Sequence, residues 1–224
     1  MSITTSEAPK PTESARRQKT RERLMDAAFE VFSEVGIHAA TVEMIAERAD
    51  FTRGAFYSNF DTKEELFLAL AERGNNQRLA LLRQSVEHMD QILPEILGAP
   101  GAKLQPENLG LLVTSFLDQQ NENSYWFLFQ SELRLLAMRD PAVGSIYLEQ
   151  KAAAETEFAN IISAALRAVG LSSELNPLEL ASVLTTTYES TLQEAIMQGG
   201  PQVQKIAHEL VRTKLVALIT QLAR

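Results

Sequence analysis

Residues 41–63 read TVEMIAERADFTRGAFYSNFDTK, and this stretch decides the fold that we expect. Apolar side chains recur at the spacing of one helical face at Val42, Ile45, Ala46 and Ala49. This spacing predicts a short helix over residues 42–49, and Thr41 before it is a favourable N-cap. Asp50 and Phe51 predict a tight turn after the helix, because aspartate enters the left-handed region more readily than most residues.

A second short helix is predicted directly after the turn. Thr52 can cap it, and its residues are Arg53, Gly54, Ala55, Phe56, Tyr57 and Ser58. Asp61 or Thr62 can cap a third, longer helix, with Glu64 or Glu65 three residues on as in a capping box. Two short helices at a sharp turn, the second carrying arginine, threonine, serine and tyrosine, are typical of a helix-turn-helix that enters the major groove of DNA.

The stretch resembles the DNA-binding domain of the tetracycline-repressor (TetR) family, over roughly residues 19–70 of the chain. The agreement in order and spacing has no gaps, and it is carried by Thr41, Ile45-Ala46, Ala49-Asp50-Phe51-Thr52, Gly54-Ala55-Phe56-Tyr57, Asn59-Phe60 and Thr62-Lys63-Glu64-Glu65-Leu66. The chain departs from the family pattern at two positions. Asp50 stands where a turn glycine is usual, and Asn59 stands where histidine or tyrosine is common. The resemblance implies a homodimeric regulator of transcription, most often a repressor, whose body encloses a small-molecule site.

The resemblance also implies which residues contact DNA. The groove-facing residues are expected to be Thr52, Arg53, Gly54, Ala55 and Tyr57, and the phosphate contacts Thr41, Tyr57, Asn59 and Lys63. Arg53 is the best base reader among them, because a guanidinium can donate to O6 and N7 of one guanine together. Gly54 would allow close approach to the groove, and the Ala55 methyl can meet a thymine methyl. We therefore expect a double-stranded DNA partner.

The charge distribution is compatible with DNA binding although the net charge is −8. Residues 10–23 carry six basic and two acidic side chains. Screening limits charge effects to ~8 Å at physiological salt, so this basic arm matters more than the total charge. Arg16 and Arg17 are expected to lie along a phosphate backbone or to reach a minor groove. The alternative is a solvated helix end.

The composition argues against several other classes of protein. The chain has no cysteine, which excludes disulfides, a thiolate nucleophile and a cysteine-ligated zinc site. Its three histidines stand far apart, so we expect no metal site, no cofactor and no enzyme activity. No apolar run reaches the ~18 residues of a membrane span, and the N-terminus lacks the apolar core of a secretory signal. We therefore expect a cytoplasmic protein without a membrane partner.

The rest of the chain is predicted to be helical. A first long helix over residues 16–35 should end at Gly36, with its apolar stripe formed by Leu24, Ala28, Val31, Phe32 and Val35. A connecting helix should run from residue 62 to about residue 93, with a kink at Gly74. Further helices are expected at 106–120, 124–138, 141–169, 176–198 and 201–223, with Asp140-Pro141 and Asn176-Pro177 as helix starts. The predicted fold class is all-α with about nine helices, divided into a disordered tail (1–14), a helix-turn-helix domain (15–62) and a helical ligand-binding and dimerisation domain (63–224).

The last two predicted helices are apolar on more than one side, which favours a second burial surface on a partner chain. The residues expected in this dimer interface are Leu184, Tyr188, Leu192, Leu215, Leu218 and Leu222. A dimer would place two recognition helices one DNA turn or a multiple of it apart, so that they read a palindromic operator. The alternative is a helix pair buried inside a monomer.

Aromatic residues gather in the middle of the chain and indicate a cavity for a partly apolar small molecule, although plain packing is the alternative for each of them. The candidate lining residues are His88, Phe116, Trp126, Phe129, Gln130, Met138, Phe158, Asn160 and Thr187. The sequence thus predicts a ligand-responsive regulator of transcription. Two alternatives stay open: a helical ligand-binding or scaffold protein with a vestigial helix-turn-helix, and an all-α enzyme.

Overall fold

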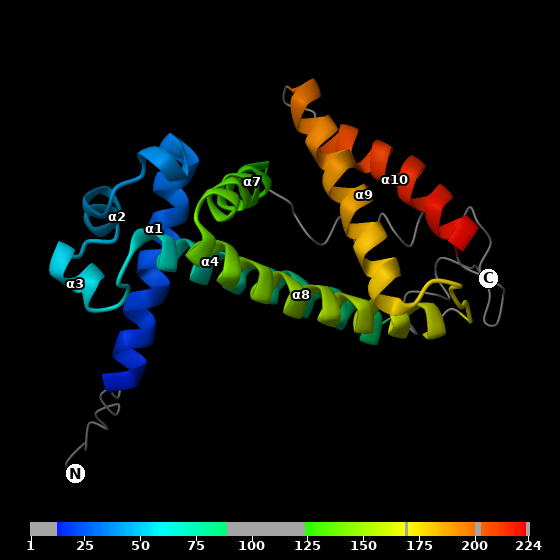
Figure 1. Cartoon of the computed structure of the whole chain (residues 1–224), viewed down its shortest axis with the longest axis horizontal. Helices are drawn as coiled ribbons and strands as arrows, with labels where there is room; N and C mark the ends of the chain where they lie inside the picture. The colour runs from blue at the N-terminus through cyan, green and yellow to red at the C-terminus, as the bar shows by residue number, and fades with distance from the viewer. Residues whose placement is uncertain (1–12, 89–123, 169, 200–202, 223–224) are drawn as a thin grey trace, which may run out of the picture. The chain divides into compact units, whose positions relative to one another are not determined.

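A computed structural model describes residues 13–88, 124–168, 170–199 and 203–222 of the chain. Within these ranges every regular element is an α-helix, which confirms the predicted fold class (Figure 1). The helices are α1 (Glu13–Ala39), α2 (Val42–Arg48), α3 (Arg53–Tyr57), α4 (Lys63–Glu87), α7 (Ser124–Arg139), α8 (Pro141–Ala168), α9 (Pro177–Gln198) and α10 (Val203–Leu222). The helix predicted at 106–120 lies outside the described residues. None of the described helices combines the length and apolar character needed to cross a membrane.

The chain divides into two compact units, one ending at Leu70 and the other beginning at Ala71. The domain boundary predicted at residue 62 is the point where α4 begins, so the first unit also includes the start of that helix. Leu66 and Phe67 of this segment are fully buried. Because these residues complete a core, the division falls inside the helix and not in the turn before it.

The core of the first unit is made where α1, α2, α3 and the start of α4 bring their apolar faces together. Its fully buried members include Leu24, Ile45, Phe56, Phe60 and Phe67. Four of the five residues predicted for the α1 stripe are buried, but Val35 is 41% exposed and that part of the prediction is wrong. The chain bends at Gly36 (φ 77°, ψ 165°) and continues as a helical turn to Ala39. Glycine adopts this positive φ without the steric cost that a Cβ would bring.

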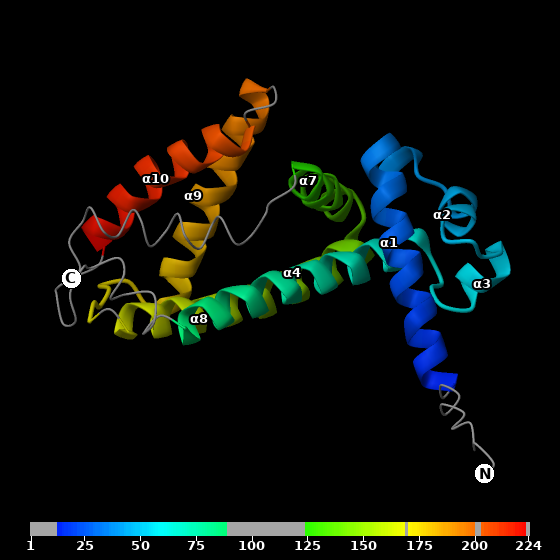
Figure 2. The ribbon, with the colours of Figure 1, turned by 180° about the vertical axis from the view of Figure 1, so that it is seen from behind.

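In the second unit, α9 and α10 form an antiparallel pair that packs against α8 (Figures 1 and 2). One cluster joins Leu180 and Leu184 of α9 to Leu215 of α10, and Phe158 of α8 packs against it. A second cluster joins Leu192 and Ala195 of α9 to Ala207 of α10, nearer to the turn between these two helices. The apolar faces of α9 and α10 therefore pack against each other within a single chain.

The helix starts of the second unit follow the predicted punctuation. The Asn176 side chain accepts a hydrogen bond from the Glu179 amide (3.0 Å), and the Glu179 carboxylate accepts one from the Asn176 amide (3.1 Å). Pro177 stands at the first helical position, where its missing N–H costs nothing. Asp140 in turn accepts from the Ala142 amide at the start of α8 (2.9 Å). These local signals define where α8 and α9 begin.

Gly74 does not kink α4, which runs through it as one helix from Lys63 to Glu87. Its role is one of packing: a Cβ at this position would lie 2.1 Å from Cη2 of Trp126. The prediction of a kink is therefore wrong. Glycine at position 74 allows the indole of α7 to rest directly on the backbone of α4.

Candidate nucleic-acid interface and ligand pocket

The turn between α2 and α3 has the geometry that the sequence predicts. The Thr41 hydroxyl accepts a hydrogen bond from the Met44 amide at the start of α2, and the Thr52 hydroxyl accepts one from the Ala55 amide at the start of α3 (both 3.2 Å). Asp50 has φ 57° and is the one described residue other than glycine with a positive φ. Both threonines are exposed, so their hydroxyls hold the helix starts at the surface.

α3 has one buried and one exposed face. Phe56 is completely buried, and it packs against Phe60 with ring centroids 5.9 Å apart. Arg53, Gly54 and Tyr57 are exposed, and Ala55 is half-buried. A Cβ at Gly54 would contact only the Thr52 hydroxyl, at 3.7 Å, so the space in front of this glycine is open. The expected groove-facing residues thus share one accessible surface.

Arg53 is held in place by two neighbours. Its Nη1 lies 2.9 Å from Oε1 of Glu43 on α2, and its guanidinium lies 5.5 Å from the centroid of the Tyr57 ring. The contact with Tyr57 and then the charge of Glu43 raise the pKa of the guanidinium above its usual value. A base or phosphate that binds Arg53 must compete with Glu43. The sequence analysis did not identify Glu43, because nothing in its spacing shows that α2 and α3 place the two side chains together.

Asn59, one of the predicted phosphate contacts, is buried in the first unit. Its side chain is 8% exposed, and Nδ2 donates to the carbonyl of Ala55 (2.8 Å). Its own carbonyl accepts a hydrogen bond from Arg21 of α1. Asn59 therefore closes the end of α3 from inside, and its phosphate contact stays a prediction that this burial does not favour.

Lys63 is also engaged within the unit. Its ammonium donates to the carbonyls of Ile37 (3.1 Å) and Ala40 (2.9 Å), and its side chain is half-buried. These carbonyls lie at the end of α1, where a cation interacts favourably with unpaired acceptors and with the helix dipole. The structure therefore gives Lys63 a capping role that the sequence analysis did not anticipate.

Lys63→Met should lower the free energy of unfolding of the first unit by about 1–2 kcal/mol, because two charge-assisted hydrogen bonds are lost. Urea unfolding followed by far-ultraviolet circular dichroism measures this change. Arg17→Met is the matched control, since it removes an exposed cation of α1 and should change stability by no more than about 0.5 kcal/mol. Equal effects of the two substitutions would contradict the capping role.

The basic arm divides into two functional parts. Arg16, Arg17 and Lys19 are exposed on the first turns of α1. Arg21 instead lies over the ring of Phe60, 3.9 Å from its centroid, while Arg23 lies 4.4 Å from the Phe51 centroid and donates to the Ala49 carbonyl (2.7 Å). Two of the six basic residues therefore fasten α1 to the helix-turn-helix. Arg16, Arg17 and Lys19 remain exposed, and their contact with a phosphate backbone stays a prediction.

The second unit contains a pocket of about 350 Å³ between α4, α7, α8, α9 and Leu215 of α10. Of the predicted lining residues, Trp126, Gln130 and Phe158 do line it. Phe129 is fully buried outside the lining, and the Thr187 hydroxyl donates to the Val183 carbonyl. The predicted pocket residues that are exposed are His88, Met138 and Asn160. Phe116 lies outside the described residues.

The residues predicted for the dimer interface mostly face the inside of the subunit. Leu184, Leu192 and Leu215 are buried in the single chain, and with Tyr188 they line the pocket. Leu218 packs against the α9–α10 core, and the side chain of Leu222 lies outside the described part. The structure corrects the interface prediction for the three buried leucines, because they retain almost no surface that a partner could cover.

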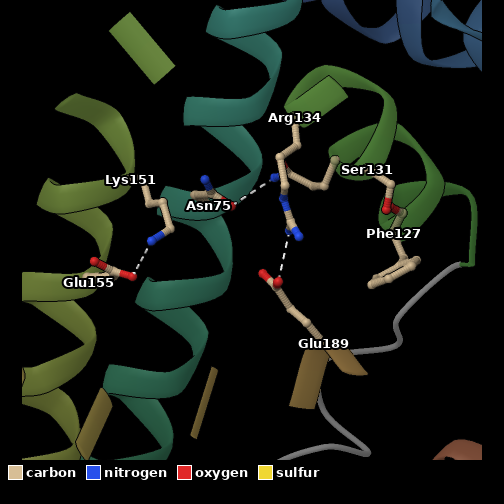
Figure 3. Close-up of polar contacts among 8 residues, drawn as sticks. Asn75, Phe127, Ser131, Arg134, Lys151, Glu155 and Glu189 are labelled. Carbon is tan, nitrogen blue, oxygen red and sulfur yellow. Dashed lines mark hydrogen bonds and ion pairs between the residues drawn. The ribbon is translucent and has the colours of Figure 1, made fainter. Parts of the chain in front are cut away.

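Polar residues of the pocket lining form two contacts between helices and one within α8 (Figure 3). Arg134 of α7 donates to Glu189 of α9 (2.8 Å), and Gln130 of α7 donates to Asn75 of α4 (3.1 Å). Lys151 and Glu155 pair one turn apart on α8 (2.7 Å). Gln130 is among the residues predicted from the sequence, whereas the ion pair of Arg134 with Glu189 is not. Their separation of 55 residues gives no local pattern that could reveal it.

Comparisons with known proteins match the first unit in sequence. Residues 24–70 match the family model described as bacterial regulatory proteins of the tetR family. The chain is 36% identical over 70 residues to the transcriptional regulator UidR of Escherichia coli K12. The aligned region covers 31% of this chain and 36% of that protein. It is also 37% identical over 70 residues to the transcriptional activator FasR of Mycolicibacterium smegmatis. This aligned region covers 31% of this chain and 32% of that protein. The match therefore spans about a third of the length of these relatives.

Comparisons with solved structures extend over both units. A TetR transcription regulator from Haloarcula marismortui aligns with a TM-score of 0.66 at 17% identity, covering 92% of this chain and 100% of that chain. Salmonella enterica GusR aligns with a TM-score of 0.64 at 18% identity, covering 95% and 98%. SmeT, the repressor of the Stenotrophomonas maltophilia multidrug efflux pump SmeDEF, aligns with a TM-score of 0.57 at 21% identity, covering 93% and 92%. The first unit therefore matches the TetR family model in sequence, and the chain as a whole shares the fold of these solved TetR-type regulators.

Proposed function

We propose that this protein is a cytoplasmic, ligand-responsive regulator of transcription that binds a palindromic operator as a homodimer and is released by a small molecule. The observation that carries the proposal is the exposed face of α3. Arg53, Gly54 and Tyr57 are accessible together, while Phe56 anchors the helix from below. A helix presented in this way suits the major groove, where side-chain donors can read base edges.

The pocket supplies the ligand-responsive part of the proposal. Its volume of about 350 Å³ is in the range of small-molecule sites, and aromatic residues line it beside a few polar groups. α4 begins with Lys63 in the first unit and lines the pocket from Ala71 to Val86. A ligand that binds one position of α4 better than another would shift the population of DNA-binding states. Among the relatives SmeT is a repressor and FasR an activator, and we favour repression for this chain.

Selection from a pool of random duplexes tests the DNA-binding part. The full chain should enrich one palindromic sequence, and it should bind that sequence at least about a thousandfold more tightly than scrambled DNA. Enrichment of no sequence would leave the helix-turn-helix as a vestigial element of a ligand-binding or scaffold protein. A transcription assay with the selected operator downstream of a promoter then separates repression from activation.

Arg53→Ala should weaken operator binding by about 1–3 kcal/mol and relax the preference at one base pair of each half-site. Its affinity for scrambled DNA should change little, because base-edge contacts carry the sequence information. Fluorescence anisotropy with operator and scrambled duplexes at several salt concentrations measures both effects. Equal weakening on the two duplexes would assign Arg53 to phosphate contact.

Glu43→Gln is the companion variant for this test. It removes the carboxylate that lies 2.9 Å from Arg53, together with one negative charge beside the DNA-facing surface. Binding to scrambled DNA should therefore strengthen, and the ratio of the affinity for the operator to the affinity for scrambled DNA should fall. Unchanged binding to scrambled DNA would show that Glu43 does not restrain Arg53.

The homodimer is expected to have a mass of twice 24.9 kDa by light scattering at micromolar concentration. The interface between the two subunits should lie on the outward side of α9, where Val183 is 37% and Met197 is 73% exposed. The double substitution Val183→Asp and Met197→Asp should yield folded monomers, because it places two carboxylates in an apolar contact. Met138→Asp, which alters a residue of α7 that is 69% exposed, is the control and should leave the dimer intact. A monomeric wild type would contradict both the dimer and the palindrome.

A further inference from the structure

The lining of the pocket changes from polar to apolar along its length. α4 and α8 lie side by side and run in the same direction, as Figures 1 and 2 show, and an ion pair between Arg83 and Glu157 joins them. The pocket residues of α4 begin with Ala71, Asn75 and Arg78 and end with Leu79, Leu82 and Val86. Those of α8 begin with Tyr147, Gln150, Lys151, Ala154 and Glu155 and end with Phe158, Ile161, Ile162 and Ala165. Because the two helices are parallel, their polar parts meet at one end and their apolar parts at the other.

Arg134 stands at the polar end. It follows Trp126 and Gln130 at intervals of four residues on α7, so that the three side chains project from one face of the helix into the pocket. Its Nη2 lies 2.8 Å from Oε2 of Glu189, and both side chains are more than a third exposed, at 39% and 38%. A half-exposed ion pair of this kind is weak, so a ligand can exchange for one of its members.

The protonation state of Arg134 is secure. Burial by itself lowers the pKa of the guanidinium, but the contact with Tyr147 and the charge of Glu189 outweigh burial and raise it. Because a guanidinium keeps its proton throughout the physiological pH range, the side chain remains a cation when Glu189 is displaced. A guanidinium also presents its donors as a planar fork that fits a carboxylate or a phosphate in two places at once.

The charges that line the pocket indicate the sign of the charge that a ligand should carry. Arg78, Arg134 and Lys151 are cationic, and Glu155 and Glu189 are anionic, which leaves one net positive charge among the lining residues. An acidic ligand that displaces Glu189 keeps Arg134 paired, and the released carboxylate can turn toward solvent. A cationic ligand that took the place of Arg134 on Glu189 would instead separate the guanidinium from its carboxylate, and Arg78 and Lys151 would be further like charges in the lining.

We propose that the pocket binds an elongated amphipathic acid, whose anionic head takes the place of Glu189 on Arg134 and whose apolar body lies toward Phe158, Leu184 and Leu215. The proposal rests on the proposed function only in requiring that a small molecule occupies the pocket. It names the chemical class of that molecule, which is an acid whose chain or ring system is long enough to extend from the polar end of the pocket into the apolar end.

Four decyl amphiphiles test the class of ligand with one apolar body and different heads: decanoate, decyl phosphate, decanol and decyltrimethylammonium. Each is titrated below its micelle-forming concentration into the full-length protein, and binding is followed by Trp126 fluorescence and by calorimetry. At least one of the two acids should bind about tenfold more tightly than decanol, and the cation should bind more weakly than decanol. The comparison of decanoate with decyl phosphate identifies which acidic head the site prefers.

Three variants test the role of Arg134. Arg134→Gln should reduce the affinity for the preferred acid to the level of decanol and leave decanol binding unchanged. Glu189→Gln should strengthen binding of the acid, because it removes the charged competitor for the guanidinium. Arg83→Gln is the matched control, since Arg83 pairs with Glu157 outside the lining, and it should bind the acid like the wild type.

Four results would overturn the proposal. Tightest binding of decyltrimethylammonium would assign the pocket to cations. Equal binding of all four compounds, or acid binding that survives Arg134→Gln, would show that the polar end does not select the head. Absence of binding by every compound would reject the amphipathic acid even if the protein selects an operator, so this failure is distinct from failure of the DNA-binding proposal.

Discussion

Replacing Phe56 with alanine should lower the free energy of unfolding of the first unit by about 3–5 kcal/mol and abolish operator binding. Phe56 is completely buried, and its ring packs against Phe60 (5.9 Å between centroids) and edge-on against Tyr57 (5.4 Å). On the other side of the same short helix Arg53 is exposed, where the proposed function has it read DNA. Loss of the ring therefore leaves a cavity under the recognition helix and removes what holds it in position.

The single tryptophan makes this prediction measurable unit by unit. Trp126 belongs to the second unit, so its fluorescence follows that unit, while far-ultraviolet circular dichroism follows both. Phe56→Ala should add an early transition to the circular dichroism curve without moving the fluorescence transition. Tyr57→Ala is the control: its ring is 45% exposed, so it should cost about 1 kcal/mol while still weakening DNA binding. Equal losses of stability would mean that Phe56 does not anchor α3.

Leu215→Asp should unfold the second unit, with a loss of at least about 4 kcal/mol. Leu215 is 7% exposed and packs between Leu180 and Leu184 of α9. A carboxylate there would lose the leucine contacts and would enter an apolar core without a partner for its charge. The fluorescence transition of Trp126 should shift to much lower urea concentration or disappear.

Val183→Asp is the variant that distinguishes unfolding of the second unit from loss of a subunit interface. It introduces the same carboxylate on the exposed side of α9, so the chain should keep its stability. Light scattering and urea unfolding of the two variants together decide where each residue lies. A folded Leu215→Asp monomer with the stability of the wild type would place Leu215 at a subunit contact after all.

The sequence by itself determined the elements whose causes are local. Thr41, Thr52 and Asn176 cap the helices that they precede, and Asp50 adopts the left-handed turn that its short polar side chain permits. Helical periodicity located α2, α3 and the described helices α7 to α10 to within a few residues. Caps, turns and periodicity involve residues within about four positions of one another, so a single sequence shows them.

The candidate DNA surface was predictable only in part for the same reason. The exposure of Arg53 and Tyr57 follows from the period of α3 around the buried Phe56. Helical period does not reveal that Asn59 turns inward or that Lys63 reaches the end of α1, because those contacts join residues from different elements. Their side chains are polar in either role, and sequence alone cannot tell a phosphate contact from a cap.

Only the tertiary structure decided how the two-sided apolar helices are used. Leu184 and Leu215 carry the same pattern whether they pack against a partner chain or against each other, and the antiparallel pairing of α9 and α10 places them in one core. The ion pair of Arg134 with Glu189 exists because α7 and α9 meet beside the pocket. Burial and pairing depend on which faces meet in space. That choice belongs to the packing of whole helices, and no local stretch of the chain contains it.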